Sequence, residues 1–258
     1  MITELSDNER CDRVNEDLVL ITDKSGLSLG TDTLLLSYFI KGKPNLRALE
    51  LGAGTGILSM LVAARKKAGA ITAVEIQEKY ASLAARNVEY NRLSERITVI
   101  CGDVRDLSTA GIPREKFDIV FSNPPYMPLS CGARNATDDN FIARHEVHGE
   151  FKDFAHAAAY ALRYGGRFFC VHRPDRLTDL LFALRCEKLE PKRLTFIQPS
   201  AEEAPSLVLI EAAAGGKPGV AVTAPILLYT DRTHTHETEV IKSALHNGNF
   251  TENTSCQT

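Results

Sequence analysis

The feature that most constrains the fold is an alternation of short apolar runs with longer helical stretches, which begins at residue 47. Two of the longer stretches, Ile57–Lys67 and Gln77–Asn91, are long enough for helices. Further helices are predicted at Phe151–Leu162 and, entered through Pro174, at Arg176–Cys186. The predicted strands are Arg47–Leu51, Ala70–Glu75, Ile97–Cys101, Phe117–Ser122, Gly166–His172, Leu189–Ile197 and Leu207–Ala212. Such alternation favours an α/β fold, with a mostly parallel, doubly wound sheet and helices on both of its faces.

The composition is typical of a globular protein in a reducing compartment. Hydrophobic residues make up 44% and charged residues 24% of the 258 residues. The six cysteines form no CxxC pair, and the polar N-terminus does not resemble a signal peptide. No apolar run approaches the length that spans a bilayer. We therefore predict a cytoplasmic protein with no membrane partner.

The formal net charge of −3 bears on the choice of partner. It gives no global basic signature of a nucleic-acid-binding protein, so binding of RNA would depend on a local basic patch.

A glycine-rich turn follows the first predicted strand and precedes the first predicted helix of the alternation. The segment Ala48–Gly56 has the pattern GxGxG, formed by Gly52, Gly54 and Gly56, with Glu50 two positions before the first glycine. Glycines at such a place permit a tight turn and a close approach of the backbone to a ligand. A plain β–α turn or a dinucleotide loop would explain the glycines alone, although the spacing differs from the GxGxxG pattern of NAD-binding proteins.

Two more carboxylates follow the next two strands. Glu75 ends the second strand, about 20 residues beyond the glycines, where a carboxylate can accept both hydroxyls of a ribose. Asp103 follows the third strand, where it can accept a hydrogen bond from an adenine amine. Individually they could be a surface charge and a helix cap. Because the carboxyl ends of parallel strands face one crevice, the sequence predicts a ligand that contains an adenosine moiety.

The fourth predicted strand ends in Asn123-Pro124-Pro125-Tyr126. Consecutive prolines cannot continue a sheet ladder, so the segment could simply end the strand. It also suits methylation of an aniline-like amine, whose lone pair is delocalised into the ring. The side-chain oxygen of Asn123 and the carbonyl of Pro124 can accept its two N–H groups, while Tyr126 stacks on the base. Positioning and electrostatics would then supply most of the catalysis.

This motif, downstream of Glu50–Gly56, resembles the [DNS]-P-P-[YFW] class of Rossmann-like, class I methyltransferases. That class includes adenine-N6 enzymes of DNA and RNA and the HemK-type enzymes that methylate glutamine in release factors. Further segments are similar to the bacterial tRNA1(Val) adenine-37 N6-methyltransferase family. They are Ser28–Ser37, Ala143–Glu146, Val171–Leu177, Gly215–Gly219 and Ala224–Tyr229.

The resemblance covers about residues 9–240. It implies a class I fold with a seven-stranded sheet, S-adenosylmethionine as cofactor, adenine 37 of a tRNA anticodon loop as substrate, and Asn123 to Tyr126 as the catalytic motif. The sequence departs from the family at Leu29, where an aromatic residue is usual, and at Glu211–Ala214, where the family often carries basic residues.

Several residues have a functional and a structural interpretation. The resemblance places Asp32 over the methionine end of the cofactor, whereas a position before a predicted helix at Thr33–Phe39 would make it an N-cap. Arg144, His145 and Arg173 are candidates for contact with substrate phosphates, or else pair with neighbouring carboxylates. The pair His234 and His236 has no third ligand at suitable spacing, so no metal is predicted.

The predicted organisation has three parts: an extension at residues 1–46 that packs over the cofactor site, a methyltransferase domain at 47–230, and a polar, mobile tail at 231–258. The first 46 residues leave little room for the helical domain of HemK-type enzymes, and no target-recognition domain of a DNA enzyme is visible. Glutamine methylation of a protein, adenine methylation of rRNA, and an RNA-binding protein without catalysis stay open as alternatives. The oligomeric state is open as well, with a monomer favoured.

Overall fold

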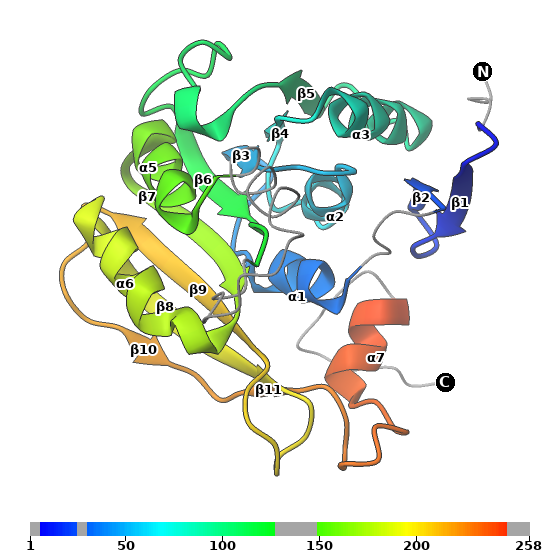
Figure 1. Cartoon of the computed structure of the whole chain (residues 1–258), viewed down its shortest axis with the longest axis vertical. Coiled ribbons are helices and arrows are strands. Elements are labelled where there is room, and N and C mark those ends of the chain that lie inside the picture. The colour runs from blue at the N-terminus through cyan, green and yellow to red at the C-terminus, as the bar shows by residue number, and fades with distance from the viewer. Residues whose placement is uncertain (1–5, 25–29, 127–148, 247–258) are drawn as a thin grey trace, which may run out of the picture.

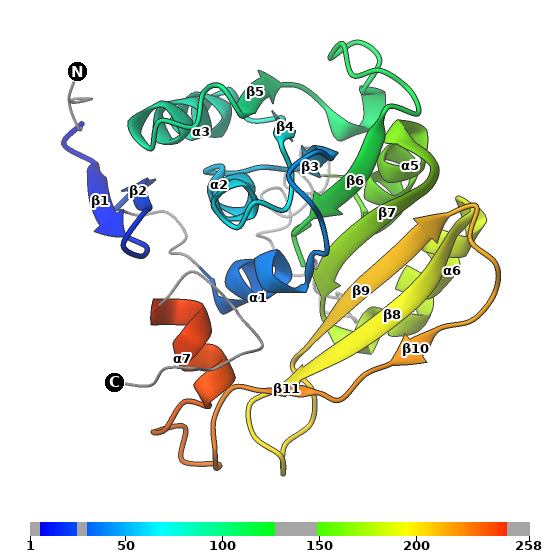
Figure 2. The same ribbon diagram turned by 180° about the vertical axis from the view of Figure 1, so that it is seen from behind.

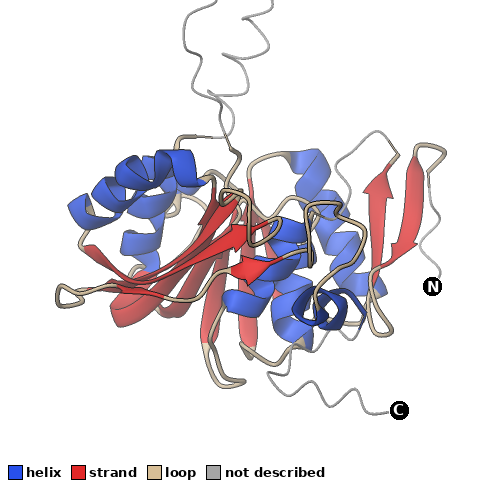
Figure 3. Ribbon diagram, turned by 90° about the horizontal axis from the view of Figure 1, so that it is seen from below, coloured by secondary structure: helices blue, strands red, loops and turns tan. Residues whose placement is uncertain are grey.

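A computed structural model describes residues 6–24, 30–126 and 149–246 of the chain. A nine-stranded sheet forms its centre, and Figure 3 shows helices on both faces of that sheet. The strands are β3 (Arg47–Leu51), β4 (Ala70–Glu75), β5 (Ile97–Cys101), β6 (Phe117–Ser122), β7 (Leu162–His172), β8 (Leu189–Gln198), β9 (Leu207–Ala214), β10 (Ala221–Val222) and β11 (Ile226–Leu227). The predicted Rossmann-like fold is confirmed.

The strand order is β10-β8-β9-β7-β6-β3-β4-β5, and β11 also pairs with β8 (Figure 1). All pairs are parallel except those of β9, which runs antiparallel to β7 and β8. The chain passes from β3 outward through β4 to β5 and then returns to the other side of β3 with β6. The boundary between β3 and β6 is therefore the switch point, outside whose carboxyl ends open α/β sheets bind ligands.

The helices form two layers, each with its own part of the hydrophobic core. They are α1 (Thr31–Phe39), α2 (Ile57–Ala64), α3 (Glu78–Tyr90), α5 (Phe151–Ala161), α6 (Leu177–Cys186) and α7 (Glu239–His246), with the short 3-10 helices η1 (Val104–Asp106) and η2 (Pro174–Arg176). Buried side chains of α1, α2 and α3 pack on one face of the sheet. Those of α5 and α6 pack on the other. The sheet is thus shielded from water on both faces, which explains its continuous apolar strands.

The seven predicted strands are all present, and β3 to β6 match their predicted bounds at both ends. The prediction of seven strands falls short of nine because β10 and β11 have two residues each, too few for an alternating pattern. Strand β7 begins at Leu162, earlier than predicted. A register shift in its pairing with β6, between Phe117 and Ile119, accommodates this early start.

An antiparallel hairpin of β1 (Glu9–Arg13) and β2 (Val19–Asp23) precedes the main sheet and was not predicted. It lies beside α3 (Figure 2). The side-chain amide of Asn87 on α3 accepts the N–H of Ile21 at 2.7 Å and donates to its carbonyl at 3.0 Å. Asn91 binds Val19 in the same way, at 2.9 Å and 2.7 Å. Two asparagines thereby satisfy the open edge of β2 as a further strand would.

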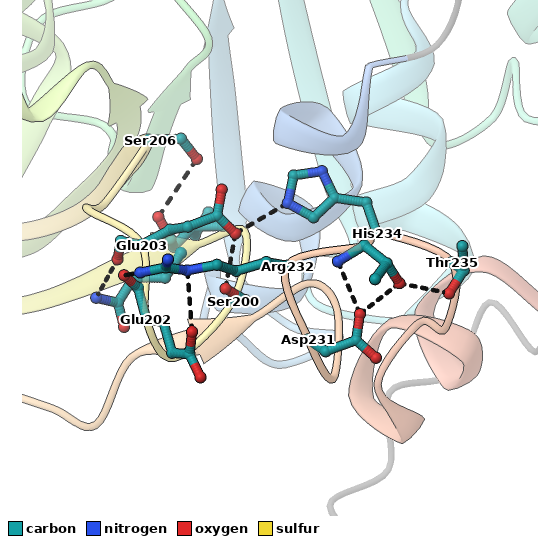
Figure 4. A network of polar contacts seen from close by, with 11 residues as sticks. Ser200, Glu202, Glu203, Ser206, Asp231, Arg232, His234 and Thr235 are labelled. Atoms are coloured by element: carbon teal, nitrogen blue, oxygen red, sulfur yellow. Dashed lines mark hydrogen bonds and ion pairs between the residues drawn. The ribbon is translucent and has the colours of Figure 1, made fainter.

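The predicted polar tail contains a helix that the sequence analysis did not anticipate. Helix α7 packs against α1, and its Ile241 belongs to the hydrophobic core that covers this face of the sheet, where it is only 3% exposed to solvent. A polar network anchors the segment before α7 to the loop between β8 and β9 (Figure 4). In it, Glu203 binds Nε2 of His234 at 2.9 Å and the hydroxyl of Ser200 at 2.6 Å, and Arg232 pairs with Glu202. In the part of the chain that the structure describes, no helix is long and apolar enough to cross a membrane.

Candidate active site

The glycine-rich turn between β3 and α2 forms the floor of a large pocket. Gly52, Gly54 and Gly56 have φ angles of +72°, +52° and +80°, a region in which side chains are strained. A Cβ at Gly52 or Gly56 would lie 3.3 Å from Phe154 or 3.1 Å from Ala84, whereas one at Gly54 would meet no protein atom within 4 Å. Gly52 and Gly56 therefore allow close packing, and Gly54 leaves open space for a ligand.

Glu75, at the end of β4, supports the glycine-rich turn through a hydrogen bond to its backbone. Its side chain accepts the N–H of Gly54 at 2.8 Å and the N–H of Gln77 at 2.9 Å, and the residue is only 5% exposed. Each carboxylate oxygen keeps a second lone pair, so the group can still accept hydroxyls from a ligand. Glu75 is thus a structural element of the turn as well as a wall of the pocket.

Glu50 lies beneath the turn and is 2% exposed. Its carboxyl group accepts the hydroxyl of Ser59 in a short hydrogen bond and the N–H of Ser59 at 3.1 Å. Burial raises the pKa of Glu50 to about 8, while the bonds from Ser59 oppose the shift and the nearby charge of Glu75 adds to it. The carboxyl group therefore takes up a proton more readily than an ordinary glutamate.

Asp103 follows β5 and combines its two predicted roles. It caps η1 by accepting the N–H of Arg105 at 2.8 Å, and it lines the pocket. The guanidinium of Arg105 also binds both carboxylate oxygens, at 2.9 Å and 2.6 Å, which lowers the pKa of Asp103. The residue stays ionised and can accept a hydrogen bond from a ligand.

These residues surround one cavity of about 820 Å³ at the carboxyl ends of β3, β4, β5 and β6. Of the predicted cofactor residues, Asp32, Glu50, Gly52, Gly54, Glu75 and Asp103 line it, whereas Gly56 does not. The cavity is also lined by residues that were not predicted: the apolar Ile76, Val104 and Phe154 and the hairpin residues Leu20 and Thr22. Ile76 and Val104 directly follow Glu75 and Asp103 in the sequence. This adjacency to the two predicted carboxylates could have identified them as residues of the pocket.

The segment Asn123-Pro124-Pro125-Tyr126 continues from β6 into the same cavity, where Asn123 and Pro125 form part of the wall. The hydroxyl of Tyr126 donates to Oδ1 of Asn123 at 2.7 Å. Burial, and next the charge of Asp32, raise the pKa of the Tyr126 phenol above its usual range, so it stays protonated. The motif thus presents the neutral amide of Asn123 to the pocket, and the neutral phenol of Tyr126 is hydrogen-bonded to that amide.

Asp32 meets this motif from α1. Its Oδ2 accepts a hydrogen bond from Nδ2 of Asn123 at 3.1 Å and lies 3.0 Å from the hydroxyl of Tyr126. The hydroxyl of Thr33 accepts a second hydrogen bond from the same amide nitrogen, at 3.0 Å. The interpretation of Asp32 as an N-cap is wrong, because the N-cap of α1 is Gly30 and Asp32 lies within the first turn. In the observed conformation, the carboxylate binds Asn123 and Tyr126.

His172, which the sequence analysis did not select, supports Tyr126 from the end of β7. Its ring packs edge-on against the rings of Tyr126 and Phe151, with centroids 5.2 Å and 5.8 Å away. Nδ1 accepts the N–H of Arg173 at 2.8 Å, and burial lowers the pKa of His172. His172 is therefore a neutral aromatic side chain that packs against the ring of Tyr126.

The predicted substrate residues lie apart from the cavity or outside the described residues. Arg173 follows β7, has a side chain that is 57% exposed, and approaches Asp175 at 3.7 Å. Arg144 and His145 lie outside the described residues. Among the residues that the structure describes, no cluster of three or more His, Cys, Asp or Glu side chains has an arrangement suited to a metal ion.

Comparison with known proteins identifies the family of this fold and pocket. The sequence profile described as "Methyltransferase small domain" matches residues 24–181. The chain belongs to the methyltransferase small domain family. It is therefore a Rossmann-like methyltransferase, as the motifs at Gly52–Gly56 and Asn123–Tyr126 predicted.

Relatives of this methyltransferase carry a more specific name. A tRNA1(Val) (adenine(37)-N6)-methyltransferase of Porphyromonas gingivalis is 29% identical over 196 residues, which are 73% of this chain and 76% of the relative. A protein of the same name from Citrobacter koseri is 32% identical over 157 residues, or 60% and 61% of the two chains.

Solved structures agree with the family. A predicted O-methyltransferase of Agrobacterium tumefaciens has a TM-score of 0.67 at 26% identity, over 84% of this chain and 96% of the other. TYW2 of M. jannaschii, solved in complex with AdoMet, shares the fold, with a TM-score of 0.55 at 13% identity over 83% and 88% of the chains.

Proposed function

We propose that this methyltransferase transfers a methyl group from S-adenosylmethionine to the N6 amine of an adenine in tRNA, at position 37 of the anticodon loop. The observation that carries the proposal is the amide of Asn123, which lies beside a tyrosine on the wall of the cavity that the glycine-rich turn opens. The names of the Porphyromonas gingivalis and Citrobacter koseri relatives support the choice of tRNA and of position 37.

The cavity suits an adenosine-containing cofactor. Its volume of about 820 Å³ lies within the range of small-molecule sites, and Gly54 keeps its floor clear of side chains. Glu75 would accept the ribose hydroxyls and Asp103 the adenine amine, while Ile76 and Val104 offer apolar surface to the purine. When bound, S-adenosylmethionine supplies an electrophilic methyl group.

Asn123 and Pro124 would bind the acceptor amine. The Oδ1 atom of Asn123 and the Pro124 carbonyl accept its two N–H groups, which draws the nitrogen lone pair out of the ring and toward the methyl donor. In the observed conformation, Oδ1 accepts the hydroxyl of Tyr126, so the amine replaces that bond or shares the oxygen with it. The raised pKa of Tyr126 leaves this phenol unsuited as a base. Its ring serves to stack on the adenine.

Arg173 extends the proposed RNA contact beyond the cavity. It follows the carboxyl end of β7, the strand next to β6, and its half-exposed guanidinium lies 3.7 Å from the carboxylate of Asp175. We assign it to a phosphate of the anticodon stem-loop, where it adds affinity without sequence information. The roles of Arg144 and His145 stay predictions from the sequence.

A methyl-transfer assay on unmodified bulk tRNA, followed by nucleoside analysis, tests the proposal. We expect labelled N6-methyladenosine from the wild-type protein. For Asn123→Ala we expect a loss of at least about 100-fold in transfer, with cofactor affinity nearly intact. Equal loss of both would mean that Asn123 shapes the cofactor site instead. Cofactor binding without label in tRNA would contradict the proposed substrate.

A further inference from the structure

We propose that Asp32 is a positioning residue that fixes the orientation of the Asn123 side-chain amide. This inference rests on the proposed function, in which Oδ1 of Asn123 accepts the acceptor amine. The family resemblance places Asp32 over the methionine end of the cofactor. In the present proposal, Asp32 acts instead through its contact with Asn123.

An asparagine amide has two faces of almost equal shape and opposite hydrogen-bonding character. Its oxygen can accept the N–H groups of an amine, whereas its nitrogen would point a donor at a donor. Nothing within the amide itself selects between the two orientations. A site that depends on Oδ1 therefore needs a neighbour that binds only Nδ2.

The first turn of α1 is such a neighbour. The carboxylate of Asp32 can only accept hydrogen bonds, and its Oδ2 lies 3.1 Å from Nδ2 of Asn123. The hydroxyl of Thr33 lies 3.0 Å from the same nitrogen and can accept its second N–H. With both N–H groups bound by α1, Oδ1 is left on the side of Tyr126.

The carboxylate of Asp32 is itself held in place. Its Oδ1 accepts the N–H of Thr33 at 2.7 Å, at the amino end of α1 where a negative charge is favourable. A Cβ at Gly30 would lie 2.2 Å from that oxygen, so only glycine leaves room for it. The φ angle of Gly30 is −81°, which any residue adopts. Gly30 is thus required by the position of Asp32 and not by its own backbone.

Asp32→Asn tests the orientation directly. An amide at position 32 can donate to Oδ1 of Asn123 and so stabilises the wrong orientation. We expect kcat for methyl transfer to fall at least about 100-fold, while cofactor affinity in calorimetry changes less than about threefold. Asp179→Asn, on the exposed face of α6, is the matched control and should behave as wild type. A cofactor affinity that falls in step with activity would overturn the proposal in favour of a cofactor residue.

A swap of the two side chains gives a sharper test. Asn123→Asp alone sets two carboxylates about 3.1 Å apart, so we expect very low activity. In the double variant Asp32→Asn with Asn123→Asp, the new amide at 32 can donate to the new carboxylate at 123. We expect the double variant to be at least about 10-fold more active than Asn123→Asp. A double variant no better than the single one would contradict the assignment.

Nuclear magnetic resonance separates this inference from the choice of substrate. The side-chain amide signals of Asn123 are assigned by their loss in Asn123→Asp. We expect their solvent exchange to be slow in the wild type and clearly faster in Asp32→Asn and in Gly30→Ala, which displaces the carboxylate but keeps its charge. Unchanged exchange in both variants would overturn the proposal. A wild-type protein that labels no RNA would instead contradict the proposed function, and the exchange measurement would still report on Asp32.

Discussion

At the scale of single residues, the burial of Glu50 links the cofactor turn to pH. The pKa of this carboxyl group is about 8 in the folded protein, against an ordinary value of 4.5. Between these values the unfolded chain has lost a proton that the folded protein still holds. The contribution of Glu50 to stability is therefore fully present below about pH 4.5 and is lost as the pH rises through 8.

Glu50→Gln should remove this dependence, because glutamine is a neutral side chain of the same shape. As the pH rises from 5 to 8, the wild type should lose stability that the variant keeps. We therefore expect the unfolding free energy of the variant, relative to that of the wild type, to increase by at most about 1.4 kcal/mol per pH unit. Urea denaturation at three pH values in this range measures the difference. Parallel pH profiles for the two proteins would show that Glu50 has an ordinary pKa.

Glu75 belongs to the same scale, since one side chain serves both the turn and the ligand. We expect Glu75→Ala to weaken the binding of S-adenosylmethionine by about 1–3 kcal/mol, through the loss of charge-assisted bonds to the ribose and of the bond to Gly54. Calorimetry measures this change. Glu78→Ala removes an exposed carboxylate of the first turn of α3 and is the control. An unchanged affinity for Glu75→Ala would refute the assignment of Glu75.

At the scale of elements, α7 should contribute to the stability of the main body through the buried side chain of Ile241. Ile241→Ala leaves a cavity beside α1, and we expect it to cost about 2–4 kcal/mol of unfolding free energy. The neighbouring Val240 is 43% exposed, so Val240→Ala should cost less than about 0.5 kcal/mol. Thermal or urea denaturation compares the two. Equal, small losses would mean that α7 is not docked on α1 in solution.

The elements also explain how far the sequence could predict the fold. Strands β3 to β6 were predicted with their bounds because each is an apolar run with clear breakers at its carboxyl end, such as Gly52 and Pro124. The β1–β2 hairpin was missed because its edge is satisfied by Asn87 and Asn91, polar residues on a distant helix that carry no local signal. Helix α7 was missed because its segment is mostly polar, and among its residues with described side chains, Glu239–Lys242, Ile241 is the buried one.

The candidate site shows the same division between local and distant information. The carboxylates after β4 and β5 and the motif after β6 could be placed from the sequence, because parallel strands bring their carboxyl ends to one edge. The contact of Asp32 with Asn123 joins residues 91 positions apart. It depends on how α1 packs on the sheet, which the pattern of the sequence does not contain.

At the scale of the whole molecule, one cavity at the switch point of the sheet joins the proposed cofactor site and the proposed acceptor site. The side of the cavity near β4 and β5 carries the residues proposed for the cofactor, and the side near β6 and α1 carries those proposed for the acceptor. The methyl group would then pass from one side of this cavity to the other. The central strands β3 and β6, which carry the glycine-rich turn and the Asn123 motif, are almost entirely buried, which limits local opening of this part of the sheet.

The measurement that tests this account most directly is methyl transfer to a tRNA1(Val) transcript with adenine at position 37, compared with the same transcript carrying guanine there. We expect labelled N6-methyladenosine in the first transcript and no label in the second. Equal labelling of both transcripts would move the acceptor away from position 37. No labelling of either, with cofactor bound, would contradict the claim that this site methylates tRNA.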